Sequence, residues 1–153
     1  MSTVLALSRP AEWNFPLFVH VLGAMVLVGA LLTAVSAMAF ARGDARYLRL
    51  GYWTLLAVGL PAYIVMRIGA EWIADKEGLN DEGAPEPAWL GIGYIVADVG
   101  ALLILISLIL GGVGVRRLGD GKGAGLLKAT MILALIVLAA AVVAVWAMSG
   151  KPE

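Results

Sequence analysis

The segment Asn14–Phe40 reads NFPLFVHVLGAMVLVGALLTAVSAMAF, and His20 is its only ionisable side chain. A helix needs about 20 mainly apolar residues to cross a bilayer, and this segment is longer than that. A cleaved signal peptide instead has an apolar region of about 7–15 residues behind a basic stretch, whereas Arg9 is the only basic residue before this segment. The segment therefore predicts a retained transmembrane helix, and it raises the question of how His20 is accommodated.

The composition of the whole chain also favours a membrane protein. Of its 153 residues, 61% are hydrophobic and 14% are charged, and the mean hydropathy is +0.93. Soluble domains are about 45–50% apolar and about 25% charged, and a small domain buries too little surface to hide such an excess. We therefore expect the lipid bilayer to be the main surrounding of the protein.

Four apolar segments separated by polar connectors predict an all-α fold. The predicted spans are residues 15–41, 50–73, 89–115 and 126–148. The connectors between them are rich in charged residues, Gly and Pro, which end helices. The sequence thus predicts a single integral membrane domain, residues 1–153, built as a bundle of four transmembrane helices that run up-down-up-down.

The distribution of Lys and Arg predicts the orientation of this bundle. The first and third connectors hold seven basic residues, and the other polar regions hold three. The seven are Arg42, Arg46, Arg49, Arg116, Arg117, Lys122 and Lys128, and the three are Arg9, Lys76 and Lys151. Because cytoplasmic loops carry an excess of positive charge, we expect a multi-pass protein of the cell's inner (plasma) membrane with both termini outside the cytoplasm.

Composition also excludes several classes of function. The formal net charge is zero, so nothing indicates nucleic acid as a partner. The chain has no cysteine, which excludes disulfides, thiolate metal sites and cysteine nucleophiles. With one histidine, a transition-metal site made by the protein alone is not expected either. The sequence shows no hydrolase triad or phosphate-binding loop, so an enzymatic activity is the less expected outcome.

The ionisable residues within the spans are the candidates for a functional site. They are His20, Arg67, Glu71 and Asp98, which lie on three different spans. A rise of about 1.5 Å per residue places them at depths of roughly 7, 9, 3 and 12 Å from the outer boundary. Arg67 and Glu71 are four residues apart and therefore share a helix face, which Tyr63 continues. Asp98 is predicted to lie at a depth that Arg67 can reach.

This polar cluster has three interpretations. It is a neutralised ion-pair network that orients the helices, or a ligand-binding or proton-handling pocket open to the outer face, or a pair, Arg67 and Glu71, that reaches the membrane surface. The ligand or proton-handling candidates are His20, Tyr63, Arg67, Glu71 and Asp98. The function expected from this cluster is an accessory, binding or transport-associated role, with a proton-coupled permeation element as an alternative. A membrane-protein partner or a homo-oligomer is compatible with each.

The second alternative is a membrane redox protein that binds haem b. An axial imidazole and a nearby cation for the propionates are what such a haem needs, and His20 and Arg67 would supply them. Gly23 and Ala24 lie one turn inward of His20 and leave room beside the imidazole for a close helix or a flat ligand. Because the chain has no second histidine, the other axial ligand would be a Met, a small molecule or His20 of a second subunit.

The stretch FVHVLGAMVLVG, residues 18–29, carries a resemblance to known proteins. It resembles the opening helix of bacterial four-span integral membrane proteins of unknown function, which are related in look to the membrane domain of copper-resistance D proteins. HemJ-type protoporphyrinogen oxidases open with a similar histidine-containing helix and bind haem. The resemblance covers the first span alone and implies a four-span architecture with His20 as the one shared functional position.

Three further features of the sequence predict local structure. Pro61 lies in the middle of the second span, where it removes a helix hydrogen bond and predicts a kink. The acidic, Gly- and Pro-containing connector 75–87 is predicted to be the most mobile one and to lack an apolar face that packs on the bundle. Small residues recur every four positions and predict close helix packing. They are Gly29, Thr33, Ala37 and Ala41, and Gly93, Ala97 and Ala101.

Overall fold

A computed structural model describes residues 10–84 and 87–150 of the chain. All regular elements in these two ranges are helical. In chain order they are η1 (Ala11–Trp13), α2 (Asn14–Ala39), α3 (Ala45–Thr54), η2 (Leu55–Gly59), α4 (Leu60–Lys76), α5 (Ala88–Arg117), η3 (Leu118–Asp120) and α6 (Ala124–Gly150). Arg9, Lys151, Pro85 and Glu86, which entered the predictions on topology and on the connector, lie outside the described residues.

The predicted four-helix membrane fold is confirmed. Four helical segments of the described chain are long and apolar enough to cross a membrane. They are Ala11–Ala39, Ala45–Lys76, Ala88–Asp120 and Ala124–Gly150. The second segment begins five residues before the predicted span, because Asp44 caps the helix and its Oδ1 accepts a hydrogen bond from the Arg46 backbone N–H at 2.8 Å. Arg46 and Arg49 therefore belong to the helix and not to the connector.

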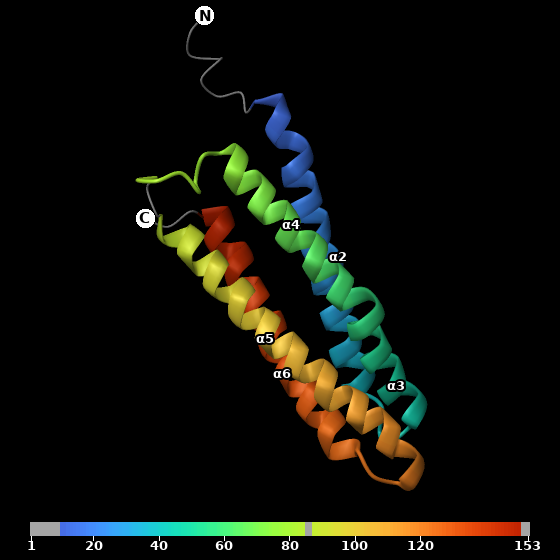
Figure 1. Ribbon diagram of the computed structural model, residues 1–153. Helices are drawn as coiled ribbons and strands as arrows, with labels where there is room; N and C mark the ends of the chain where they lie inside the picture. The colour runs from blue at the N-terminus through green and yellow to red at the C-terminus, as the bar shows by residue number, and fades with distance from the viewer. Residues whose placement is uncertain (1–9, 85–86, 151–153) are drawn as a thin grey trace, which may run out of the picture.

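The four helices form two antiparallel pairs (Figure 1). The second span, made of α3, η2 and α4, packs along α2, and α5 packs along α6. Near α3 the two pairs lie close together, and toward the other end α4 and α5 diverge (Figure 1). We call this diverging end the terminal end, because the described chain begins and ends there. The opposite end, which holds Arg42, Arg46, Arg116 and Arg117, is the basic end.

The core lies where the two pairs meet, and the outer surfaces of the helices are apolar as well. Leu31, Ala34 and Leu127 are almost completely buried between the pairs. Large apolar side chains such as those of Phe18 and Ile109 are exposed on the outside. Helices that are apolar on every face are typical of a protein whose outer surface contacts lipid. This distribution is that of a multi-pass membrane protein.

The predicted interruption of the second span takes the form of a π-helical turn. The turn η2 ends two residues before Pro61, so the helix is wound more widely next to the point where proline cannot donate a hydrogen bond. The predicted small-residue contacts are only partly correct. Gly93 and Ala41 are buried, but Gly29 and Thr33 are exposed, and a Cβ added to Gly29 would meet no atom within 4 Å. The close contact of α2 with α4 is instead at Gly23, which faces Met66.

The connector between α4 and α5 packs on the bundle more than the sequence predicted. Its backbone turns are held by hydrogen bonds such as that from the Leu79 N–H to the Ala74 carbonyl at 2.9 Å. Leu79 is half-buried and lines the cavity described below. The expectation that this connector has no apolar contact with the bundle is therefore wrong at Leu79. Its greater mobility stays a prediction.

Candidate functional site

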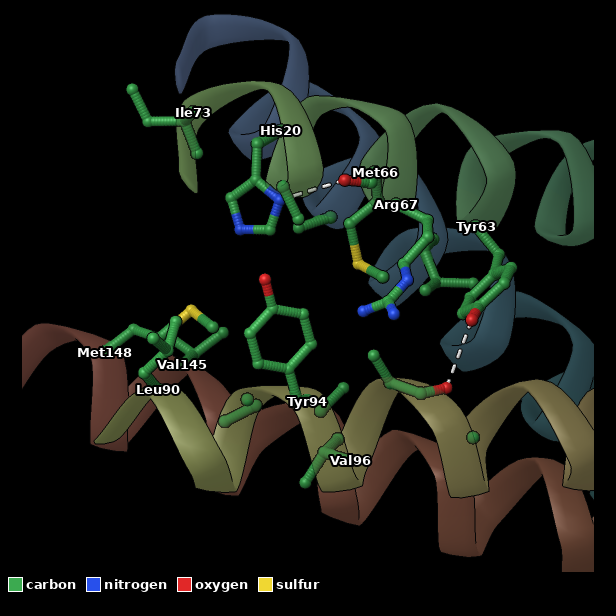
Figure 2. Close-up of a pocket in the computed structure, with 18 of the residues that line it drawn as sticks. His20, Tyr63, Met66, Arg67, Ile73, Leu90, Tyr94, Val96, Val145 and Met148 are labelled. Atoms are coloured by element: carbon green, nitrogen blue, oxygen red, sulfur yellow. Dashed lines mark hydrogen bonds between the residues drawn. The ribbon is translucent and has the colours of Figure 1, made fainter. Parts of the chain in front are cut away.

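A cavity of about 290 Å³ lies between the two helix pairs, toward the terminal end. Side chains of all four spans line it, and the wall is mainly apolar. The polar side chains on this wall include His20 from α2, Tyr63 and Arg67 from α4, and Tyr94 from α5 (Figure 2). Glu77, at the C-terminal end of α4, lies at the rim near the connector. A mainly apolar pocket with a few convergent polar groups is the usual form of a small-molecule site.

The position of His20 depends on a close crossing of α2 and α4. Gly69 of α4 faces the His20 backbone so closely that an added Cβ would collide with it. One turn further, Gly23 of α2 faces Met66 of α4, and a Cβ added there would lie 2.5 Å from the Met66 nitrogen. Two glycines on opposite helices thus allow the backbones to meet. Small residues allow transmembrane helices to approach in this way.

This crossing brings the His20 ring to the backbone of the neighbouring helix. His20 Nδ1 lies 3.0 Å from the Met66 carbonyl oxygen. A carbonyl oxygen only accepts, so Nδ1 carries the proton of this hydrogen bond and, in the neutral ring, Nε2 keeps a free lone pair. Figure 2 shows the second ring nitrogen directed into the cavity, toward the Tyr94 hydroxyl. His20 is therefore accommodated in the membrane segment by its hydrogen bond to the Met66 carbonyl and by the cavity that its second nitrogen faces.

Arg67 crosses the gap between α4 and α5. Its Nη2 lies 3.1 Å from Glu71 Oε1 and 3.2 Å from Asp98 Oδ1, so one guanidinium joins two carboxylates. Its Cζ also lies 5.0 Å from the centre of the Tyr94 ring, within the range of a cation–π contact. Two acidic groups around one cation leave this cluster with a surplus of negative charge when all are ionised.

The structure separates the predicted cluster into two parts. His20 and Arg67 line the same cavity, whereas Glu71 and Asp98 are absent from its wall. The side chain of Asp98 is 66% exposed and that of Glu71 is 46% exposed, against 29% for Arg67. The prediction that Asp98 shares a pocket with His20 is therefore wrong. Asp98 lies on the outer side of the α4–α5 gap and holds Arg67 from there.

Tyr63 forms the second connection across the same gap. Its hydroxyl donates a hydrogen bond to the Ala97 carbonyl of α5 at 3.1 Å, and its ring lines the cavity (Figure 2). Tyr63 and Arg67 are four residues apart, so both extend from one face of α4 toward α5. The helices are held apart at this level by long side chains, and the cavity lies behind these side chains.

Three contributors to the site were missed by the sequence prediction. Tyr94 stands in the cavity next to His20 and Arg67, and Met66 supplies the carbonyl that holds His20. Gly69 allows that hydrogen bond to form. Tyr94 was detectable in principle, because it is a polar aromatic residue four positions before Asp98 on the same span. The Met66 carbonyl was not detectable, since a backbone acceptor becomes available only through the helix crossing.

The residues of this site fit haem b poorly. His20 has an anchored Nδ1 and a free Nε2, which suits an axial ligand, and Met66 and Met148 lie on the same cavity wall. However, the Tyr94 side chain stands inside the cavity, whose volume of about 290 Å³ is small for a macrocycle. The charge of Arg67 is already offset by two carboxylates, which weakens its attraction for propionates. In the described ranges no cluster of His, Cys, Asp or Glu could hold a metal ion.

Three kinds of known protein were compared with this chain: family models, curated proteins and solved structures. No family model, no curated protein and no solved structure matches it. The resemblance to copper-resistance D and HemJ-type proteins stays a prediction.

Proposed function

We propose that this membrane protein binds a small, membrane-soluble molecule in the cavity between its two helix pairs. The observation that carries the proposal is the mainly apolar cavity, lined by all four spans, into which His20, Tyr94 and Arg67 converge. Apolar walls accommodate a lipid-soluble body, and a few polar groups orient it. This is the binding role among the predicted functions.

The size and the charge of the site narrow the class of ligand. Small-molecule pockets range from about 300 to 1,000 Å³. The cavity of about 290 Å³ lies just below the lower end of this range. An engineered apolar cavity of roughly 150 Å³ holds benzene, so one substituted ring is a suitable occupant here. The Arg67 charge is offset by Glu71 and Asp98, which disfavours an anionic ligand and favours a neutral one.

Quenching of tryptophan fluorescence by 4-bromophenol tests this proposal. Trp89 lines the cavity, and bromine quenches indole fluorescence at short range. We expect saturable quenching of the purified protein in detergent, and we expect the saturable part to disappear in Trp89→Phe. Partition of the probe into the micelle alone would give quenching that rises linearly without saturation.

A matched pair of variants on α6 places the quenching in the cavity. Ala144 lines the cavity, so Ala144→Phe is expected to fill it and to abolish saturation. Ala139 is exposed on the same helix, so Ala139→Phe adds the same group outside and is expected to leave binding intact. Equal binding by both variants, each with a normal thermal transition, would show that the cavity is not the binding site.

Haem b is the second candidate, favoured by one observation. The hydrogen bond from Nδ1 to the Met66 carbonyl orients His20 as axial histidines are oriented. A visible absorption spectrum of protein purified from haem-replete cells separates the two candidates. A Soret band that is lost in His20→Ala would support haem, and a colourless preparation would exclude it.

We further propose that the protein lies in the inner membrane with its basic end facing the cytoplasm. Both termini then lie on the opposite side of this membrane. The basic residues at this end, in the two connectors and in the adjoining helix turns, support this orientation. Reporter fusions after Asn80 and after Gly119 test it, because these residues lie in connectors at opposite ends of the bundle. We expect a cytoplasmic signal from the Gly119 fusion alone. The reverse pattern would invert the orientation.

A further inference from the structure

We infer that the cavity selects a ligand whose polar group donates a hydrogen bond, such as the hydroxyl of a small phenol or alcohol with an apolar body. This inference rests on the proposed binding function and names the substrate class of the same site. Its basis is the set of hydrogen bonds that the His20 and Tyr94 side chains already make inside the protein.

His20 presents an acceptor to the cavity. Its Nδ1 proton is engaged by the Met66 carbonyl at 3.0 Å, and turning the ring over would break this bond. The close crossing at Gly69 holds the His20 backbone against α4, so the ring stays on this wall. In the neutral ring Nε2 therefore meets the ligand with a lone pair, and a lone pair requires a donor.

Tyr94 presents an acceptor on the same side. Its hydroxyl donates toward Asn80 Oδ1 at 3.5 Å and also has the Glu71 carboxylate within hydrogen-bond reach, and these two acceptors draw the hydroxyl proton away from His20. The phenolic oxygen keeps its lone pairs, and Figure 2 shows this oxygen close to the His20 ring across the cavity. A ligand hydroxyl that enters between the two side chains can donate to His20 Nε2. In that position it is also next to the Tyr94 oxygen.

Arg67 is the competing recognition group in the cavity. Its guanidinium is a donor group and lines the same cavity, so a ligand with only acceptor atoms would turn toward it. Nη2 is already used by Glu71 and Asp98, and the Arg67 Cζ lies 5.0 Å from the centre of the Tyr94 ring. These contacts hold the guanidinium toward α5 and leave the Nε and Nη1 donors of Arg67 as the competitors, whereas the His20 lone pair faces the cavity directly. We therefore assign selectivity to His20.

Three brominated probes of similar size separate these possibilities. 4-Bromophenol has a donor hydroxyl, 4-bromoanisole keeps the oxygen but cannot donate, and 4-bromotoluene has neither. Saturable quenching of Trp89 gives the affinity of each probe for the protein in detergent. We expect 4-bromophenol to bind about tenfold more tightly than the other two, as one additional hydrogen bond of ordinary strength would give.

Variants of the two acceptors test the assignment. His20→Phe keeps a ring but removes both nitrogens, so the preference for 4-bromophenol is expected to disappear. His20→Gln keeps an amide N–H for Met66 and an oxygen acceptor for the ligand, so it is expected to restore part of the preference. Tyr94→Phe keeps the ring next to Arg67 and is expected to reduce the preference less than His20→Phe does. A thermal transition close to that of the wild type is required of each variant.

Each possible result has a distinct meaning. Equal affinities of the wild type for the three probes would overturn the inference and leave the proposed binding function standing. Tightest binding of 4-bromoanisole would overturn it in favour of recognition by Arg67. A preference for 4-bromophenol that persists in His20→Phe would overturn the role of His20. Absence of saturable quenching by all three probes would overturn the proposed function itself.

Discussion

Helix α4 meets its two neighbours in opposite ways. Toward α2, Gly69 and Gly23 bring the backbones into contact, and a ring nitrogen reaches a main-chain carbonyl. Toward α5, Tyr63 and Arg67 bridge a gap with their side chains, and a cavity lies behind them. The same helix therefore closes one interface and keeps the other open.

The difference follows from which residues stand on each face of α4. Met66 and Gly69 are three apart and share the face toward α2, and Tyr63 and Arg67 are four apart and share the face toward α5. In a bilayer the hydrophobic effect does not drive helices together, so local packing and hydrogen bonds decide their separation. A glycine face gives contact, and a face of long polar side chains gives a cavity.

The largest expected effect on stability comes from adding a methyl group at the glycine contact between α2 and α4. In Gly69→Ala the added methyl group collides with the His20 backbone, so α2 and α4 have to separate. Overpacking of this kind costs about 1–3 kcal/mol. We expect a lower thermal transition in detergent and, because His20 moves with α2, weaker binding of 4-bromophenol.

Gly29→Ala is the matched control for this substitution. A Cβ at Gly29 meets no atom within 4 Å, and this glycine is exposed on the same helix as His20. Alanine is a better helix former than glycine by roughly 0.5–1 kcal/mol, so this variant is expected to be neutral or slightly stabilised. Equal destabilisation by the two variants would contradict the crossing at Gly69.

The opposite face of α4 is tested by removing its cation. Arg67→Met leaves the Glu71 and Asp98 carboxylates without their shared cation. Exposed pairs contribute up to about 1 kcal/mol, and removing one partner of a buried pair costs about 3–5 kcal/mol. Because these side chains are partly exposed, we expect a loss of about 1–2 kcal/mol, nearer the value for exposed pairs and measurable as a lower free energy of unfolding in detergent.

A double variant shows whether charge causes this loss. In Arg67→Met combined with Asp98→Asn, one unpaired carboxylate is removed, so part of the stability is expected to return. A double variant that is less stable than Arg67→Met would mean that Asp98 stabilises the bundle by some route other than its pairing with Arg67.

The sequence predicted the four spans and one part of the site. Hydropathy located the membrane helices because their composition differs so strongly from that of the connectors. The four-residue spacing of Arg67 and Glu71 predicted a pair that the structure contains. Gly23 was expected to leave room beside His20 for a close helix, and α4 occupies that room.

The rest depended on the rotation of each helix about its axis. Helices that are apolar on all faces carry no hydrophobic stripe to mark the side that faces the bundle. Depth alone therefore placed Asp98 beside His20, although the structure turns Asp98 outward and Tyr94 inward. For the same reason Gly29 and Thr33 were assigned to a contact from which they point away.

The smallest expected effect tests the second bridge across the α4–α5 gap. Tyr63→Phe removes the hydroxyl that donates to the Ala97 carbonyl at 3.1 Å and keeps the ring on the cavity wall. Interhelical hydrogen bonds in membranes contribute on average about 0.6 kcal/mol. We expect a loss of stability of this size, since Arg67 still joins α4 to Asp98 on α5.

The matched control is Thr33→Ala, which removes a hydroxyl bonded within its own helix to the Gly29 carbonyl at 2.8 Å. A loss in Tyr63→Phe as large as that in Arg67→Met would mean that the hydroxyl, and not the ion pair, is the main connection across the gap.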